Sequence, residues 1–113
     1  MPAGSTNSDF VELVLACGSW QEAQAIADTL LGKHLVACVE FLEIKSKYHR
    51  QGALREADEI KLVMEAAAMN FEKIEAEIKK LHSYDTFVLQ QIPIERVSKR
   101  AETWWLEETN TKD

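Results

Sequence analysis

The sequence lacks every short motif that would point directly to an enzyme. Its four glycines lie far apart, at positions 4, 18, 32 and 52, so there is no glycine-rich loop to cradle a phosphate. No CxxC, HExxH or GxSxG pattern and no EF-hand loop occurs, and no serine lies in a nucleophile elbow. From the motifs alone we predict that the protein is not an enzyme.

Cysteine, clustered basic residues and long apolar runs are equally scarce. Two cysteines, Cys17 and Cys38, make no disulfide framework, so a reducing cytoplasm is the simplest compartment. The net charge is −6 and the densest basic runs are only Lys79-Lys80 and Lys99-Arg100, which argues against nucleic acid as a partner. No apolar run approaches the roughly 20 residues of a membrane span, and the N-terminus has no secretory-signal pattern. We expect a cytoplasmic protein with no membrane or nucleic-acid partner.

The length of 113 residues and the hydrophobic share of 46% predict one domain with a packed core. We expect residues 1–9 to be a short flexible lead and residues 10–113 to form that domain. A chain of this length buries roughly two-thirds of its unfolded surface, so we expect no cofactor to be required for folding.

Hydrophobic periodicity predicts a strand, a helix and a long hairpin in the first 66 residues. The mostly apolar run Phe10 to Cys17 is typical of a central strand buried on both faces. A helix follows from Trp20, with a capping-box spacing between Ser19 and Glu22 and a C-cap expected at Gly32. Two strands, residues 35–48 and residues 59–66, flank a turn at Gln51-Gly52 and form a hairpin that overhangs an ordinary small domain.

The rest of the chain predicts a helix, a short strand and a last helix. The second helix covers residues 71–81 with Asn70 as its cap, and the fourth strand covers residues 86–92 before Pro93 ends it. The last helix is marked by Val97, Ala101, Trp104 and Trp105. This order predicts an α+β, ferredoxin-like split βαβ sandwich, with an antiparallel sheet, both main helices on one face, and an extra C-terminal helix. The last helix can cover part of the other face, and neighbouring subunits are expected to cover the rest.

A candidate metal site follows from this topology. The first strand of a split βαβ sheet lies between the third and fourth strands, so Cys17, a third-strand residue such as Glu59, and His82 can meet near one end of the sheet. A thiolate, a carboxylate and an imidazole suit a borderline-soft divalent ion such as copper or zinc. Two alternatives stay open: Cys17 is a buried small hydrophobe, or His82 interacts with the end of the second helix.

Four stretches of the chain resemble the CutA family of divalent-cation tolerance proteins. The matching segments, in order, are LVLACGSWQEAQAIADTLLGKHLVACVE at 13–40, SKYHRQG at 46–52, LHSYD at 81–85, and IPI at 92–94 followed by WLEETN at 105–110. The resemblance implies a ferredoxin-like fold and a PII-like homotrimer whose long hairpins pair across subunits. It also implies binding of divalent metal ions, copper above all and zinc as a further candidate.

The resemblance carries site residues and a second functional hypothesis. The family's proposed metal ligands fall on Cys17, Glu59 and His82, and its intersubunit cleft falls on Tyr48, Tyr84 and Asp85. The chain departs from the family pattern around this cleft at Arg50, Ala53, Ser83, Asp85, Phe87 and Val88. We therefore expect a divergent homotrimer that binds copper-type ions in metal tolerance. The alternative is a PII-like signalling or scaffold trimer that binds a small molecule or a partner protein in the cleft.

Overall fold

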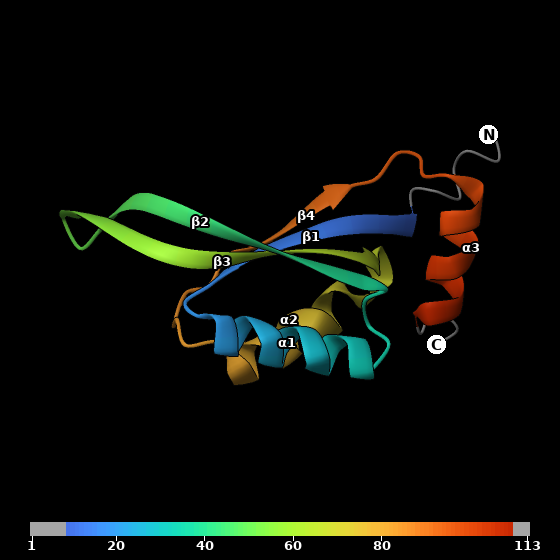
Figure 1. Cartoon of the computed structure of the whole chain (residues 1–113), viewed down its shortest axis with the longest axis horizontal. Helices are drawn as coiled ribbons and strands as arrows, with labels where there is room; N and C mark the ends of the chain where they lie inside the picture. Colours follow the sequence, from blue (N-terminus) through green and yellow to red (C-terminus); the bar gives the residue numbers. More distant parts are fainter. Residues whose placement is uncertain (1–8, 110–113) are drawn as a thin grey trace.

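The structure, a computed structural model, describes residues 9–109 (Figure 1). Its elements are β1 (Phe10–Cys17), α1 (Trp20–Gly32), β2 (Cys38–Arg50), β3 (Ala53–Ala67), the short 3-10 helix η2 (Ala68–Asn70), α2 (Phe71–Leu81), β4 (Leu89–Pro93) and α3 (Lys99–Glu108). This order confirms the predicted sequence of strands and helices. Residues 1–8 of the predicted lead lie outside the described residues.

The four strands form one antiparallel sheet in the order β2-β3-β1-β4. The first strand therefore lies between the third and the fourth, as the split βαβ plan predicts, and the α+β class is confirmed. Helices α1 and α2 lie side by side across one face of the sheet (Figure 1). The main core fills this layer and is built from buried aliphatic side chains, among them Leu13, Leu15, Ile26, Leu30, Leu62, Met64, Ile74 and Ile78.

The β2–β3 hairpin projects well beyond the two helices (Figure 1). Its strands pair without interruption from Cys38 opposite Glu65 to Arg50 opposite Ala53. The turn residues Gln51 and Gly52 both adopt left-handed backbone angles, with φ of 53° and 77°, which matches the twist of a tight hairpin. The predicted start of the third strand at residue 59 is wrong, because the backbone ladder continues through exposed positions that show no apolar alternation.

Other boundaries also differ from the prediction. Leu35 is buried but lies outside β2, which begins at Cys38, and β4 begins at Leu89 rather than at residue 86. Residues 86–88 precede the ladder, and Phe87 stacks on His82 with ring centroids 5.3 Å apart. Helix α1 includes Gly32, and the left-handed residue that follows the helix is His34, with φ of 57°. The predicted glycine C-cap is therefore wrong, because Gly32 is still helical and the C-cap residue is Lys33.

The sheet face opposite α1 and α2 is only partly covered. Helix α3 lies at one end of the sheet, where Trp105 is buried against Phe10 with ring centroids 5.4 Å apart. Farther along this face, Leu42 and Ile92 are 48% and 44% exposed. The last helix thus covers part of the face, as predicted. No helix among residues 9–109 is long and apolar enough to cross a membrane.

Candidate functional site

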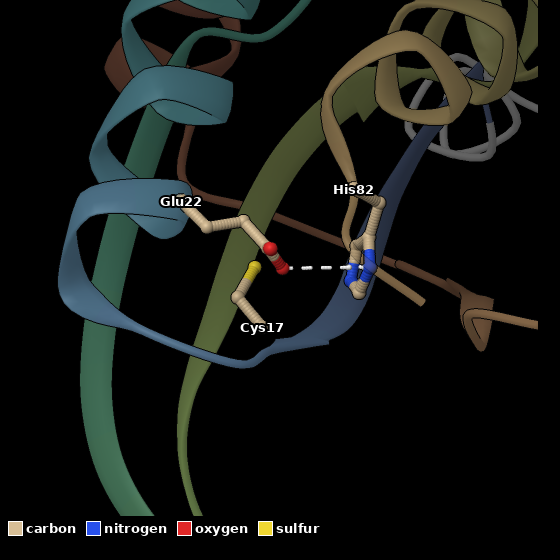
Figure 2. A group of neighbouring side chains, drawn as sticks. All are labelled: Cys17, Glu22 and His82. Carbon is tan, nitrogen blue, oxygen red and sulfur yellow. Dashed lines mark ion pairs between the residues drawn. The ribbon is translucent and has the colours of Figure 1, made fainter. Parts of the chain in front are cut away.

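The candidate site lies at the end of the sheet where β1 stops and α1 begins. The segment that follows α2 turns back at the same place. Ser19 caps α1, since its hydroxyl accepts a hydrogen bond from the Glu22 amide at 3.1 Å. This cap places Glu22 in the first turn, above the end of β1. His82 follows the last residue of α2 and reaches the same place from the other helix (Figure 2).

Cys17, Glu22 and His82 form a cluster of metal-ligating side chains. Their sulfur, oxygen and nitrogen atoms all lie within 4.8 Å of one another. The ion pair drawn as a dashed line in Figure 2 joins Glu22 Oε2 and His82 Nδ1 at 3.4 Å. Two of the three residues were predicted from the sequence, and Glu22 is new.

Backbone amides hold Glu22 in its position. Its two carboxylate oxygens accept hydrogen bonds from the amides of Gly18, at 3.1 Å, and Ser83, at 3.0 Å. Burial alone would raise the pKa of Glu22, but the hydrogen bonds from Ser83 and Gly18 lower it below its ordinary value. Glu22 is therefore ionised at neutral pH and offers a fixed negative charge to the cluster.

His82 is bonded through both ring nitrogens, and its side chain is fully buried. Its Nε2 lies 2.9 Å from the Ala16 carbonyl oxygen, and its Nδ1 lies 3.1 Å from the Tyr84 amide nitrogen. A carbonyl only accepts and an amide N–H only donates, so this pattern assigns the proton to Nε2 and the lone pair to Nδ1. That lone pair lies beside the Glu22 carboxylate. An ion that used Nδ1 would have to displace the Tyr84 amide.

Cys17 is buried on the helix side of the sheet. Burial, together with the negative charges of Glu22 and Glu59, raises the pKa of its thiol to about 12. The free thiol is therefore protonated at neutral pH. A divalent ion would reverse this balance, because a coordinated thiol loses its proton outright.

The cluster fits a small divalent ion in its donor chemistry. Around a tetrahedral ion with bonds of about 2.1 Å, two nitrogen or oxygen ligands lie about 3.4 Å apart. The 3.4 Å between Glu22 Oε2 and His82 Nδ1 matches that spacing. One thiol, one carboxylate and one imidazole give three protein ligands from three separate segments of the chain.

Glu59 does not belong to this cluster, which corrects the predicted meeting of Cys17, Glu59 and His82. Cys17 is paired directly with Ile60, so Cys17 and Ile60 share one face of the sheet and Glu59 points to the other. The Glu59 carboxylate instead accepts hydrogen bonds from the hydroxyls of Ser46, at 2.5 Å, and Tyr84, at 2.7 Å. The predicted strand order is confirmed, but the face of β3 to which Glu59 points was not predicted.

Glu59 lies in a pocket of about 630 Å³ on the open side of the sheet, between the hairpin and the segment that precedes β4. The three predicted cleft residues, Tyr48, Tyr84 and Asp85, all line this pocket, and so does Arg50. Burial and the neighbouring Glu59 carboxylate raise the pKa of the Tyr84 phenol, which therefore remains a hydrogen-bond donor. The same end of the sheet thus carries a thiol-containing cluster on one face and a tyrosine-lined pocket on the other.

Sequence reasoning missed two residues of these sites, Glu22 and Ser46. Glu22 was assigned only to the capping box of α1. Its position five residues after Cys17, which ends β1, was the signal that the two side chains lie close together. Ser46 carried no signal, because its role depends on the register that places Ile44 opposite Glu59.

Comparison with known proteins agrees with this fold. The family model of the CutA1 divalent ion tolerance proteins matches residues 11–108. The chain belongs to this family.

Individual relatives support the assignment. The divalent-cation tolerance protein CutA of Archaeoglobus fulgidus is 35% identical over 92 residues, which cover 81% of this chain and 90% of the relative. The CutA of Pyrococcus horikoshii is 29% identical over 90 residues, which cover 80% and 88%. A solved structure described as the periplasmic divalent cation tolerance protein CutA from Archaeoglobus fulgidus superposes with a TM-score of 0.86 at 33% identity, and covers 88% of this chain and 97% of that one.

Proposed function

We propose that this protein binds a divalent metal ion, copper or zinc, through Cys17, Glu22 and His82, in a metal-tolerance role that is binding rather than catalytic. The observation that carries the proposal is the convergence of the three ligand atoms within 4.8 Å. Membership of a family named for divalent-cation tolerance supports the same role. A bound ion would neutralise the Glu22 carboxylate and stabilise the Cys17 thiolate.

We also propose that the protein acts as a homotrimer in the cytoplasm. The apolar side chains left exposed on the open sheet face, including Leu42 and Ile92, support burial against other subunits. The hairpin that projects beyond the helices offers backbone groups for pairing across subunits (Figure 1). Sedimentation at micromolar concentration tests the trimer, and a folded monomer there would refute it. Cell fractionation tests the compartment.

The metal site is tested by native mass spectrometry with copper or zinc alone, with bound metal counted per subunit. Cys17→Ser should abolish uptake, while Cys38→Ser is the matched control, because Cys38 is the other free cysteine and lies outside the cluster. Glu22→Gln should weaken binding at least about tenfold, since it removes one charged ligand. Glu59→Gln should retain uptake, because Glu59 contributes no ligand atom to the cluster.

Two outcomes would refute this assignment. Equal uptake by the two cysteine variants would remove the thiol from the site. Loss of uptake in Glu59→Gln with retention in Glu22→Gln would restore the ligand set that the family resemblance implied. Far-UV circular dichroism of each variant controls for folding, because Glu22 also holds the amides of Gly18 and Ser83.

A second candidate function, a PII-like signalling or scaffold protein that binds a small molecule, is supported by the tyrosine-lined pocket. Its volume of about 630 Å³ lies within the usual range of small-molecule sites, about 300–1,000 Å³. This pocket and the metal cluster lie on opposite faces of the sheet, so each is tested by variants that leave the other in place.

A further inference from the structure

The pocket around Glu59 has a definite chemical character. Its deepest charged group is the Glu59 carboxylate, which is 8% exposed. Both carboxylate oxygens accept hydrogen bonds from neutral hydroxyls, those of Ser46 and Tyr84. Among residues 9–109 no lysine, arginine or histidine forms an ion pair with Glu59. A buried carboxylate with only neutral donors leaves an uncompensated negative charge in the pocket wall.

Two tyrosine side chains line the pocket that holds this charge. Tyr84 reaches Glu59 through its hydroxyl, and Tyr48, which is 39% exposed, lines the same pocket from the hairpin. Asp85 adds a second carboxylate to the lining and Val88 an apolar side chain, while Arg50 is the one cationic residue of the lining. A carboxylate in a pocket that tyrosine rings also line is a chemistry that recognises ammonium groups, because ring faces attract cations.

From these contacts we infer that the pocket binds a small organic ammonium compound, with its cationic group directed to Glu59 and its carbon substituents against Tyr48, Tyr84 and Val88. This inference deepens the second candidate function, because it names the ligand class of that pocket. It does not depend on the metal proposal, since the ammonium group and the metal cluster lie on opposite faces of the sheet.

An inorganic divalent ion fits this pocket less well than an organic cation. Glu59 belongs to no group of three metal-ligating side chains within the described part of the chain. Its oxygens already accept from two hydroxyls, and the remaining lining is largely tyrosine, serine and aliphatic carbon. A hard metal ion requires several converging oxygen ligands, whereas an ammonium group with methyl or methylene substituents uses one carboxylate and the adjacent ring faces.

The position of Arg50 separates a cationic ligand from an anionic one. Strand residues rise about 3.3 Å each, and six residues separate Arg50 from Ile44, the partner of Glu59, so the two backbone positions lie about 20 Å apart along the hairpin. Arg50 therefore lines the outer end of the pocket. It would repel an ammonium compound weakly and would attract an anionic compound directly.

The chain offers a specific probe for the test, because it contains only two tyrosines and both line this pocket. We suggest NMR titration of protein labelled with ¹³C in the tyrosine rings. Three probes of similar branched shape differ in charge: tetramethylammonium, tert-butanol and pivalate. We expect saturable shifts of the tyrosine signals with tetramethylammonium at millimolar concentration, and none with tert-butanol or pivalate. Equal shifts with the neutral probe, or shifts with pivalate alone, would overturn the ammonium assignment.

Two matched carboxylate variants test the role of Glu59. Glu59→Gln should weaken tetramethylammonium binding at least about tenfold, because it removes the charge but keeps the shape. Asp58→Asn is the control, since Asp58 is an exposed neighbour on the same strand that does not line this pocket. Equal losses in the two variants would refute a specific role of Glu59. The probe series on the unmodified protein decides the question if Glu59→Gln fails to fold.

Arginine variants complete the test. Arg50→Ala should leave tetramethylammonium binding unchanged or strengthen it, and Arg55→Ala, a hairpin arginine outside the pocket, should have no effect. Weaker binding in Arg50→Ala would overturn the proposal. If pivalate binds through Arg50 and tetramethylammonium does not bind, the ligand class is wrong while a small-molecule role for the pocket stands. If no probe binds in folded protein, both this ligand class and the second candidate function lose their support.

Discussion

A row of carboxylates on the open sheet face should make the stability of this protein fall between acidic and neutral pH. Glu65 is paired with Glu12 on one side and with Cys38 on the other, and Glu40 lies near it. Burial, and then the charges of Glu40 and Glu12, raise the pKa of Glu65 to about 7, although a hydrogen bond with Cys38 opposes the rise. The ordinary value for this group is 4.5.

The sign of the effect follows from proton linkage. The folded state holds the Glu65 proton more tightly than the unfolded chain, so the stabilisation is fully present below the unfolded pKa and is lost as the pH rises through about 7. A rise from 4.5 to about 7 corresponds to at most about 3 kcal/mol of unfolding free energy. Glu65 is only half-buried, so solvent screening should reduce the observed effect to about 1–2 kcal/mol.

We would measure urea unfolding from about pH 5 to about pH 8 at one fixed protein concentration. The native protein should lose about 1–2 kcal/mol over this range, and Glu65→Gln should lose much less and be the more stable of the two at the upper end. Glu75→Gln, on the exposed side of α2, is the matched control and should follow the native curve. Glu22 does not interfere, because its lowered pKa moves its titration below this range. Parallel curves for the native protein and Glu65→Gln would refute the argument.

Three further substitutions test the local physics of the fold. Ser19→Ala removes the side-chain cap of α1 and should cost about 1 kcal/mol in urea unfolding; no change would mean that the cap is dispensable. Ile78→Ala opens a cavity between α2 and the sheet and should cost about 2–5 kcal/mol in the same assay, and a cost below this range would show that the core closes around the cavity. Trp105→Ala should lower the melting temperature by several degrees, whereas Trp104→Ala should not, because Trp105 is buried against Phe10 and Trp104 is 46% exposed. Equal losses in the two tryptophan variants would contradict that difference in burial.

The order of elements could be predicted because side-chain periodicity reports burial directly. Phe10–Cys17 is apolar at nearly every position, and in the structure it is the central strand with neighbours on both sides. Topology alone predicts that Cys17 and His82 meet, because the first strand of this fold ends beside the segment that follows the second helix. These two residues come from sequence positions 65 apart, and only the fold plan connects them.

The third member of the cluster could not be predicted, because it depends on the register between β1 and β3. A shift of one residue in the pairing register exchanges the two faces of a strand. The position of Glu59 near the end of the sheet therefore could not show to which face its side chain points. The observed pairing of Cys17 with Ile60 sends Glu59 to the opposite side. The strand at residues 53–58 was not predicted for a different reason. These residues are mostly exposed on both faces, so their sequence shows no alternation of apolar and polar side chains, although their backbone is fully paired.

His82 and Tyr84 connect the metal cluster on one face of the sheet with the pocket on the other face. The Nδ1 atom of His82 lies near Glu22 and accepts a hydrogen bond from the Tyr84 amide. The Nε2 atom of His82 is bonded to the carbonyl of Ala16, a residue of the pocket wall. Tyr84 in turn bonds Glu59 through its hydroxyl. Removal of His82 would therefore disturb the cluster and the pocket together, and its effect could not be assigned to either. Cys17 and Glu59 each lie on one face only, so their variants separate the two sites, and His82→Ala does not.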